Sequence, residues 1–170
     1  MLFSLLGQTL ENSEEPLSIA SLDLSGFKRP TRKRKGEIAE LVFMFKAISL
    51  GFGVARPWGD SGRYDFILSY RTLMWRVQVK STERFAESGY RIKGGGFTSD
   101  YRLDEIDFLV TYIIPEEVWY VVPVSVVVRH KCPRFYPHSG SKGRLEKYRD
   151  AWHLFKLPTL QTLEAMPHLL

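Results

Sequence analysis

Asp65 and the pair Gln78 and Lys80 are side chains whose types and spacing suit phosphodiester chemistry. They lie in two segments with strand-like sequence, 63–70 and 73–80, joined by a two-residue turn. Strand side chains alternate between faces, so Gln78 and Lys80 project to one side, and an antiparallel return brings Asp65 close to them. Oxygen ligands of this kind hold a hard cation, and a lysine stabilises charge or positions water. The pattern is loose, however, and a surface hairpin with solvated side chains would carry it equally well.

A predicted amphipathic helix over 36–48 precedes these strands. Its apolar residues recur at helical spacing, and Gly51 provides the stop signal; the predicted apolar face is Ile38, Leu41, Val42, Phe45 and Ile48. On a helical wheel of this segment, Glu37 falls inside the apolar arc and Glu40 lies at its edge. Glu37 fits a first-turn acid that interacts with the helix dipole. Glu40 fits that role less well, which leaves it free to be a metal ligand.

Cations surround these carboxylates in the sequence. The turn-rich segment 56–64 carries Arg56 and Arg63, which either pair with Asp60 or Asp65 or contact phosphate. The chain has 24 basic and 19 acidic residues, and six of the cations fall within residues 28–35. Such a run forms either a solvated flexible arm or a contact to the phosphate backbone of a nucleic acid. On the second interpretation, the candidate DNA contacts here are Arg32, Lys33, Arg34 and Lys35.

A further basic segment follows the second strand. Residues 81–101 are predicted to form a loop or hairpin that carries Lys93 in front of three glycines. The stretch lacks the pattern of a nucleotide-binding P-loop. It is either a mobile loop that brings Lys93 toward DNA or a plain glycine-rich turn.

Four short motifs together resemble the PD-(D/E)XK nuclease superfamily. They are Lys35-Gly36-x3-Glu40, Arg56-Pro57, Tyr64-Asp65 and Arg76-Val77-Gln78-Val79-Lys80. The resemblance covers about residues 31–128. It is strongest for the small PD-(D/E)XK endonuclease domain that includes group I intron-encoded homing endonucleases. Archaeal Holliday-junction resolvases share the Gly-x3-Glu helix start and the aspartate followed by x-Lys.

The resemblance implies a role for each matching residue. Glu40 lies on the first helix, Asp65 is the central metal ligand, and Lys80 is the active-site lysine. Gln78 stands where most of the superfamily has Asp or Glu, as in the Gln-x-Lys branch, and the backbone carbonyl of Val79 is a further ligand. The resemblance further implies Mg²⁺, for which Mn²⁺ can substitute, a DNA substrate, and a homo-oligomer, either dimer or tetramer.

The expected fold is α/β, a restriction-endonuclease-like core with a mixed central β-sheet flanked by helices. Further strands are predicted at 106–112 and 117–128, and a short closing helix or irregular tail at 144–156. The expected division is an N-terminal extension over 1–30, a nuclease domain over 31–156 and a C-terminal tail over 157–170. A chain of 170 residues supports one domain with a sizeable core.

Three functions remain open at this stage. The first is a Mg²⁺-dependent DNA endonuclease of homing or restriction/repair type. The second is a DNA-binding module on a nuclease fold that no longer cuts, and the third is a structure-selective junction resolvase. The single cysteine, Cys132, excludes an intrachain disulfide and suits a reducing cytoplasm. The valine-rich run at 117–128 is too short to span a membrane.

Overall fold

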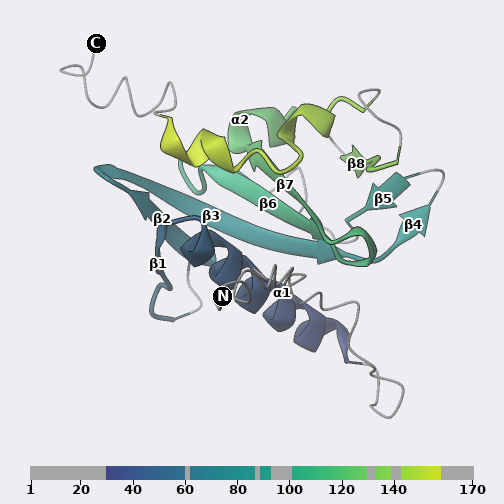
Figure 1. The fold of residues 1–170 in the computed structure, drawn as a ribbon, viewed down its shortest axis with the longest axis horizontal. Coiled ribbons are helices and arrows are strands. Elements are labelled where there is room, and N and C mark those ends of the chain that lie inside the picture. Colours follow the sequence, from purple (N-terminus) through teal and green to yellow (C-terminus); the bar gives the residue numbers. More distant parts are fainter. Residues whose placement is uncertain are drawn as a thin grey trace, which may run out of the picture.

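A five-stranded mixed sheet forms the centre of the molecule (Figure 1). We describe residues 30–59, 62–86, 89–92, 101–129, 133–138 and 143–157 of a computed structural model. The strand order is β1-β2-β3-β6-β7. Only β3 and β6 run parallel, and the other neighbours are antiparallel. The predicted α/β class with a mixed sheet is therefore confirmed. The elements are α1 (Arg32–Ser49), β1 (Gly53–Ala55), β2 (Phe66–Tyr70), β3 (Leu73–Thr82), β6 (Phe108–Ile113) and β7 (Val118–Pro123).

A second, three-stranded sheet contains an antiparallel hairpin within 81–101, as one of the two sequence-based alternatives predicted, and its third strand was not predicted. It has the order β4-β5-β8, from β4 (Phe85–Ala86), β5 (Gly89–Arg91) and β8 (Arg134–Phe135). Two of these strands are only two residues long, which is below the length at which sequence alternation identifies a strand. The remaining elements are the short helix α2 (Val124–Val127) and the 3-10 turns η2 (Ile114–Glu116), η4 (Glu146–Tyr148) and η5 (Trp152–Lys156).

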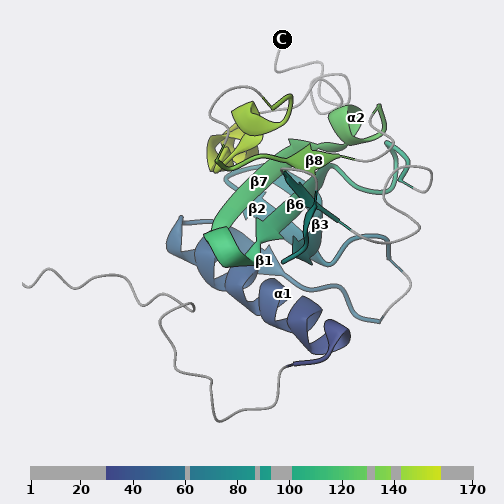
Figure 2. The ribbon, with the colours of Figure 1, turned by 90° about the vertical axis from the view of Figure 1, so that its right-hand side faces the viewer.

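Each face of the central sheet carries its own hydrophobic core. Figure 2 shows α1 on one side of the sheet and α2 on the other. On the α1 side, Phe43 lies at the centre of an aromatic cluster, with ring centroids 5.2 Å from Phe66, 6.0 Å from Trp119 and 5.9 Å from Trp152. The opposite core includes Leu109, Tyr120, Val122, Val124, Val127 and Phe135. All six residues of β6 are buried, since this strand is covered on both faces.

The helix forms as predicted but buries a different face. Ala39, Phe43 and Ala47 meet the sheet. Most of the predicted apolar face is exposed instead, with exposed fractions of 37% for Ile38, 58% for Leu41, 74% for Phe45 and 57% for Ile48. That prediction was wrong because α1 is apolar on two opposite faces, and the two small alanines allow the closer approach to the sheet. Periodicity finds an apolar stripe but does not decide which stripe is covered.

The helix is also longer than predicted at its start. It begins at Arg32, where Thr31 caps it by accepting the Arg34 backbone N–H at 3.3 Å. Residues 32–35 are therefore helical and do not form a flexible arm. At the other end, Gly51 has φ +85°, which favours glycine after a helix, as the sequence predicted.

The later segments follow the sequence with two adjustments. The strand predicted over 117–128 ends at Pro123, after which Val124–Val127 form α2. The closing segment consists of the turns η4 and η5, where Leu145, Trp152 and Phe155 are buried. The predicted N-terminal extension, apart from Pro30, lies outside the described residues, as does the tail after Leu157.

Candidate active site

The candidate site lies where the central sheet divides, at the point where β2 stops pairing with β3. Strand β2 pairs with β3 only from Tyr70–Leu73 to Phe66–Val77. Strand β3 then continues to Thr82, paired on its other side with β6. Asp65 directly precedes β2 and stands beside this open edge, and its backbone N–H donates to the Val77 carbonyl at 2.9 Å.

The Asp65 carboxylate contacts β3 just beyond the last β2–β3 pair, where the backbone of a longer β2 would continue the pairing. It accepts the Val79 backbone N–H at 2.7 Å and the Gln78 side-chain amide at 2.5 Å. The N–H and C=O of one strand residue point to the same neighbour, so the Val79 carbonyl also faces this edge. The Gln78 amide nitrogen lies 3.4 Å from that carbonyl oxygen. The structure thus brings Asp65, Gln78 and Val79 together as the sequence predicted.

Glu40 approaches the same point from α1. Burial raises its pKa, the negative charge of Asp65 raises it further, and the positive charges of Arg56 and Lys80 lower it. Arg56 donates to the Glu40 carboxylate at 3.1 Å. The sequence offered Asp60 or Asp65 as the partner of Arg56, so its pairing with Glu40 is a correction. It arises because β1 ends beside α1, which no local spacing reveals.

The Asp65 carboxyl is half-buried, and burial raises its pKa. The Val79 N–H, the cations Lys80 and Arg56, and the Gln78 amide all act in the opposite direction. The two carboxyls and the Lys80 ammonium are therefore within electrostatic reach of one another. The site combines two carboxylates that resist ionisation with one amide, one open carbonyl and one lysine.

Lys80 shares its strand face with Gln78, while Val79 turns to the α1 core, as the alternation predicted. In the parallel register Lys80 stands beside Thr111 of β6. Thr111 is fully buried, and its hydroxyl has no hydrogen-bond partner among the described residues. Nothing in the sequence singled out Thr111, because only the pairing of β3 with β6 places it there.

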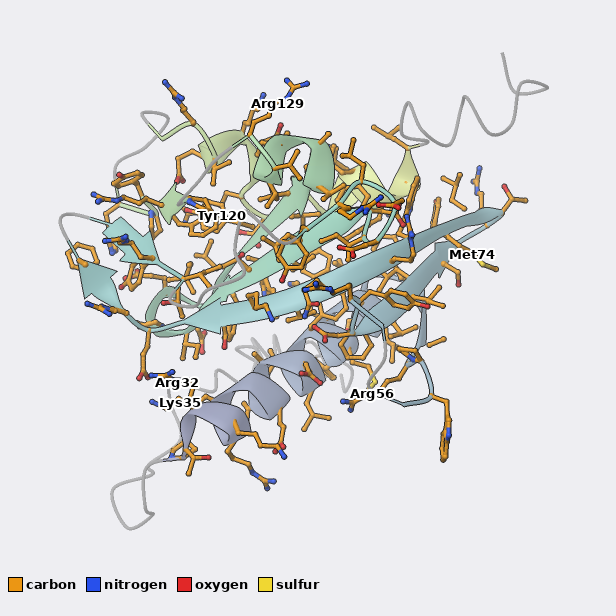
Figure 3. The ribbon with its side chains drawn as sticks, turned by 180° about the vertical axis from the view of Figure 1, so that it is seen from behind. Arg32, Lys35, Arg56, Met74, Tyr120 and Arg129 are labelled. Carbon is orange, nitrogen blue, oxygen red and sulfur yellow. The ribbon has the colours of Figure 1, made fainter. Side chains whose placement is uncertain are left out.

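Five of the predicted DNA-contacting cations lie at two places on the α1 side of the sheet. Arg32, Lys33 and Arg34 are exposed on the first turn of α1. Figure 3 shows Arg32 and Lys35 together at that end of the helix, with Arg56 farther along on the same side of the sheet. Lys93 falls outside the described residues.

Several of these cations are paired with acids. Lys35 is half-buried and lies 2.5 Å from the Glu83 carboxylate, and Arg34 lies 3.4 Å from Glu37. The Glu37–Arg34 contact gives Glu37 a role within the helix, and its negative charge adds to those that raise the pKa of Glu40. Arg63, which the sequence placed near Asp60 or Asp65, instead lies 3.8 Å from Glu105.

A second ion pair fixes the strands that carry the site. Asp107, just before β6, binds the Arg76 guanidinium at 3.0 and 3.1 Å and accepts the Arg76 backbone N–H at 2.7 Å. This bidentate contact raises the pKa of Arg76. It joins β3 to β6 two residues before Gln78. The two residues are 31 positions apart, so no local pattern could have paired them.

The side chains that could hold a metal are few. Within the described ranges, no three His, Cys, Asp or Glu residues are grouped so that they could hold an ion. Any cation here would rely on the carboxylates of Glu40 and Asp65, neutral oxygens from Gln78 and Val79, and water. Mg²⁺ accepts such a set, since it is held by one or two carboxylates and keeps several waters.

Comparisons with known proteins agree with this geometry. The sequence model of the PD-(D/E)XK endonuclease family matches residues 31–155. A solved structure of a bacterial homing endonuclease, I-Ssp6803I, is similar with a TM-score of 0.67 and 28% sequence identity, over 84% of this chain and 100% of that one. No curated protein sequence matches. The family match covers most of the chain, and it includes both the divided sheet and the carboxylate pair. The protein belongs to the PD-(D/E)XK endonuclease family and has a nuclease fold.

Proposed function

We propose that this nuclease is a metal-dependent endodeoxyribonuclease that hydrolyses phosphodiester bonds at the divided sheet. The observation that carries the proposal is the contact of Asp65 with Gln78 and Val79 at the open edge of β3, with Glu40 and Lys80 in electrostatic reach. A half-buried carboxylate pair is a poor way to stabilise a core. It is a suitable way to hold a cation next to a phosphate.

The electrostatics of the pair support a divalent cation, which we take to be Mg²⁺ with Mn²⁺ as a substitute. Burial raises the pKa of both carboxyls, and the charge of Asp65 raises that of Glu40 further. A cation between them would reverse this balance and favour both ionised forms. When bound, such an ion polarises the phosphoryl group and lowers the pKa of water.

Each side chain has a proposed task. Glu40 and Asp65 supply the charged ligands, and the Val79 carbonyl supplies a neutral one. The Gln78 amide now donates to Asp65 from its nitrogen, so it must turn its oxygen inward to act as a ligand. Lys80 positions the attacking water or stabilises the charge that develops on the phosphoryl oxygens.

The first turn of α1 supports DNA binding. It contains Arg32, Lys33, Arg34 and Lys35 and no acid, although the positive end of a helix dipole disfavours cations. A phosphate at this turn would offset that repulsion through its attraction to the cations and to the positive end of the helix dipole. We propose these four residues, together with Arg56, Arg63 and Lys93, as the DNA contacts.

The similarity to a homing endonuclease favours cleavage of duplex DNA at a specific site. A restriction or repair enzyme would use the same chemistry. A DNA binder that no longer cuts remains the second candidate, favoured by Gln78, which removes one negative charge from the usual ligand set. A structure-selective resolvase is the third.

One experiment separates these candidates. Purified protein is incubated with supercoiled plasmid and Mg²⁺ or Mn²⁺, with a chelator control and the Asp65→Ala variant. Metal-dependent nicking that the variant lacks supports the nuclease. Tight binding without cleavage, on DNA that contains the target, supports the binder. Preferential cutting of four-way junctions over linear duplex supports the resolvase.

The exposed stripe of α1 supports a homo-oligomer, dimer or tetramer. Ile38, Leu41, Phe45 and Ile48 follow one another at intervals of three, four and three residues, on the side of the helix away from the sheet. This spacing forms a seam that a second helix can fill. A twofold axis would pair the stripe with its own copy, and two active centres could then cut both strands of a duplex.

The mass of the protein in solution tests the oligomer. Leu41→Glu should reduce the mass to that of one chain, whereas the control Met74→Glu, at another exposed apolar residue, should not. Equal masses for both variants would exclude this stripe as the interface.

Within the described ranges, no helix combines the length and the apolar character that crossing a membrane requires. We propose a cytoplasmic location, which the single cysteine also suits.

A further inference from the structure

Trp58 is fully exposed at the approach to the candidate site. Its exposed fraction is 102%, whereas the other three tryptophans, Trp75, Trp119 and Trp152, are 2%, 4% and 7% exposed. Large aromatic side chains contribute most when they are buried. A lone indole that projects into water therefore gives nothing to the fold, and a contact outside the chain would explain its position.

The chain before Trp58 is constrained at two points. Two residues earlier, the Arg56 guanidinium is bound to Glu40 at 3.1 Å, which ties the start of the β1–β2 connection to α1. Pro57 restricts the backbone before the indole, and Gly59 follows with φ +82°. An aromatic ring on such a support loses little conformational freedom when it binds a partner.

The charges beside Trp58 suit a nucleic acid. Arg56 and Arg63 lie on the same connection, with side chains 68% and 54% exposed, and the connection leads directly into Asp65. Proteins that bind unpaired or distorted nucleic acid combine cations that follow the phosphates with aromatic rings on which bases stack. The connection that leads into Asp65 carries both elements of this combination, the arginines and an exposed indole.

We infer that Trp58 stacks on a nucleobase of the DNA bound at the candidate site. The inference rests on the proposed function, since it requires DNA at Asp65. The faces of bases within a duplex are covered by their neighbours, so the stack requires a base step that is opened when DNA binds. Trp58 is then a positioning residue, which holds the distorted strand while Lys80 and the carboxylates act on the phosphate.

Fluorescence gives a direct test because Trp58 is the one accessible indole. All four tryptophans of the chain are in described segments, and the other three are buried. Iodide should quench the emission of the free protein through Trp58 alone. Fragmented plasmid DNA, added with chelator at low salt, should abolish that quenching. The Trp58→Phe variant should show little iodide quenching in either state.

Affinity measurements separate stacking from simple contact. Trp58→Leu, which keeps an apolar side chain without a π face, should weaken DNA binding about 5- to 150-fold, the range for loss of one base stack. Trp58→Phe should stay within a few-fold of the wild type. Met74→Ala, at an exposed apolar residue remote from the site, is the matched control and should bind normally.

The outcomes distinguish this inference from the proposed function. If wild-type protein binds and cuts DNA while iodide still reaches Trp58, the stacking role is refuted and the nuclease assignment stands. Equal affinity of Trp58→Leu and Trp58→Phe would also refute it. If the wild type does not bind DNA at all, both proposals fail together.

Discussion

Replacing Asp65 by Asn tests whether the carboxylate pair serves a cation or the fold. The amide keeps the shape of the side chain and can still accept the Val79 N–H, but it removes the charge. Burial raises the pKa of both Asp65 and Glu40 above their ordinary values of 3.8 and 4.5. Protonation is therefore favoured more in the folded than in the unfolded state. The stability that follows is present at low pH and is lost as the pH rises through the folded-state pKa values.

The sign of this effect predicts the behaviour at neutral pH. Without metal, the ionised pair destabilises the wild type, and Asp65→Asn removes one of the two charges. The variant loses the stronger, charge-assisted form of the Val79 hydrogen bond, a difference of about 1 kcal/mol. The raised pKa of Asp65 indicates that burial outweighs such contacts. The melting temperature of metal-free Asp65→Asn should therefore be no lower than that of the wild type.

Added Mg²⁺ should reverse the order. A ligand at about 100 times its dissociation constant stabilises a one-site protein by about 2.7 kcal/mol. In a chain of this size about 1 kcal/mol corresponds to roughly 2–4 °C. The wild type should therefore gain about 5–10 °C, and Asp65→Asn should gain almost nothing.

Differential scanning calorimetry at pH 7, with a chelator and then with a Mg²⁺ series, measures both effects without DNA. The wild type without metal should also become less stable as the pH rises above the ordinary pKa values of the two carboxyls, and the variant should lose less. The reasoning is refuted if the two proteins gain the same stability from Mg²⁺. It is also refuted if the metal-free variant melts well below the wild type, because Asp65 would then be a structural residue.

Four further substitutions test the site, the helix that supports it and the central sheet. Lys80→Ala should abolish plasmid cleavage while DNA affinity stays within a few-fold, and an equal loss of both would make Lys80 only a phosphate contact. Phe43→Ala should lower the free energy of unfolding by about 3–5 kcal/mol in urea titrations, since the ring is fully buried among three other aromatic rings. Phe45→Ala, two positions along the same helix, replaces a side chain that is 74% exposed. Measured on the Leu41→Glu background, it should change the free energy of unfolding by less than about 0.5 kcal/mol. A large loss would mean that the face of α1 with Phe45 is buried rather than exposed. Thr111→Val should raise stability by about 1 kcal/mol in the same titrations, because no described residue hydrogen-bonds the buried hydroxyl; a loss of stability would show that the hydroxyl has a partner.

The central strands and their chemistry were readable from the sequence because their signals are local. The two-residue turn at Arg71 and Thr72 and the alternation in β3 set the antiparallel register. That register carries Asp65 to the point where Gln78 and Val79 leave the pairing with β2. Side-chain alternation placed Gln78 and Lys80 on one face. These features depend on neighbours within about fifteen residues.

The partners of the charged residues were not readable in this way. Arg56 binds Glu40, Arg63 lies beside Glu105, and Lys35 lies beside Glu83. Each pair joins elements that meet only after the sheet and α1 have packed. For Arg56 and Arg63 the sequence suggested Asp60 or Asp65, and for Lys35 it suggested no acid. The observed partners follow from the position of whole elements.

The sequence by itself determined which residues could perform the chemistry, because residue type and strand period are properties of the chain. Only the tertiary structure decided which face of α1 meets the sheet. Packing selected the face with Ala39 and Ala47, whose small side chains allow close approach, and left Phe45 exposed. That choice also places Glu40 near Asp65, because the direction of every side chain around a helix is set once one face is packed against the sheet.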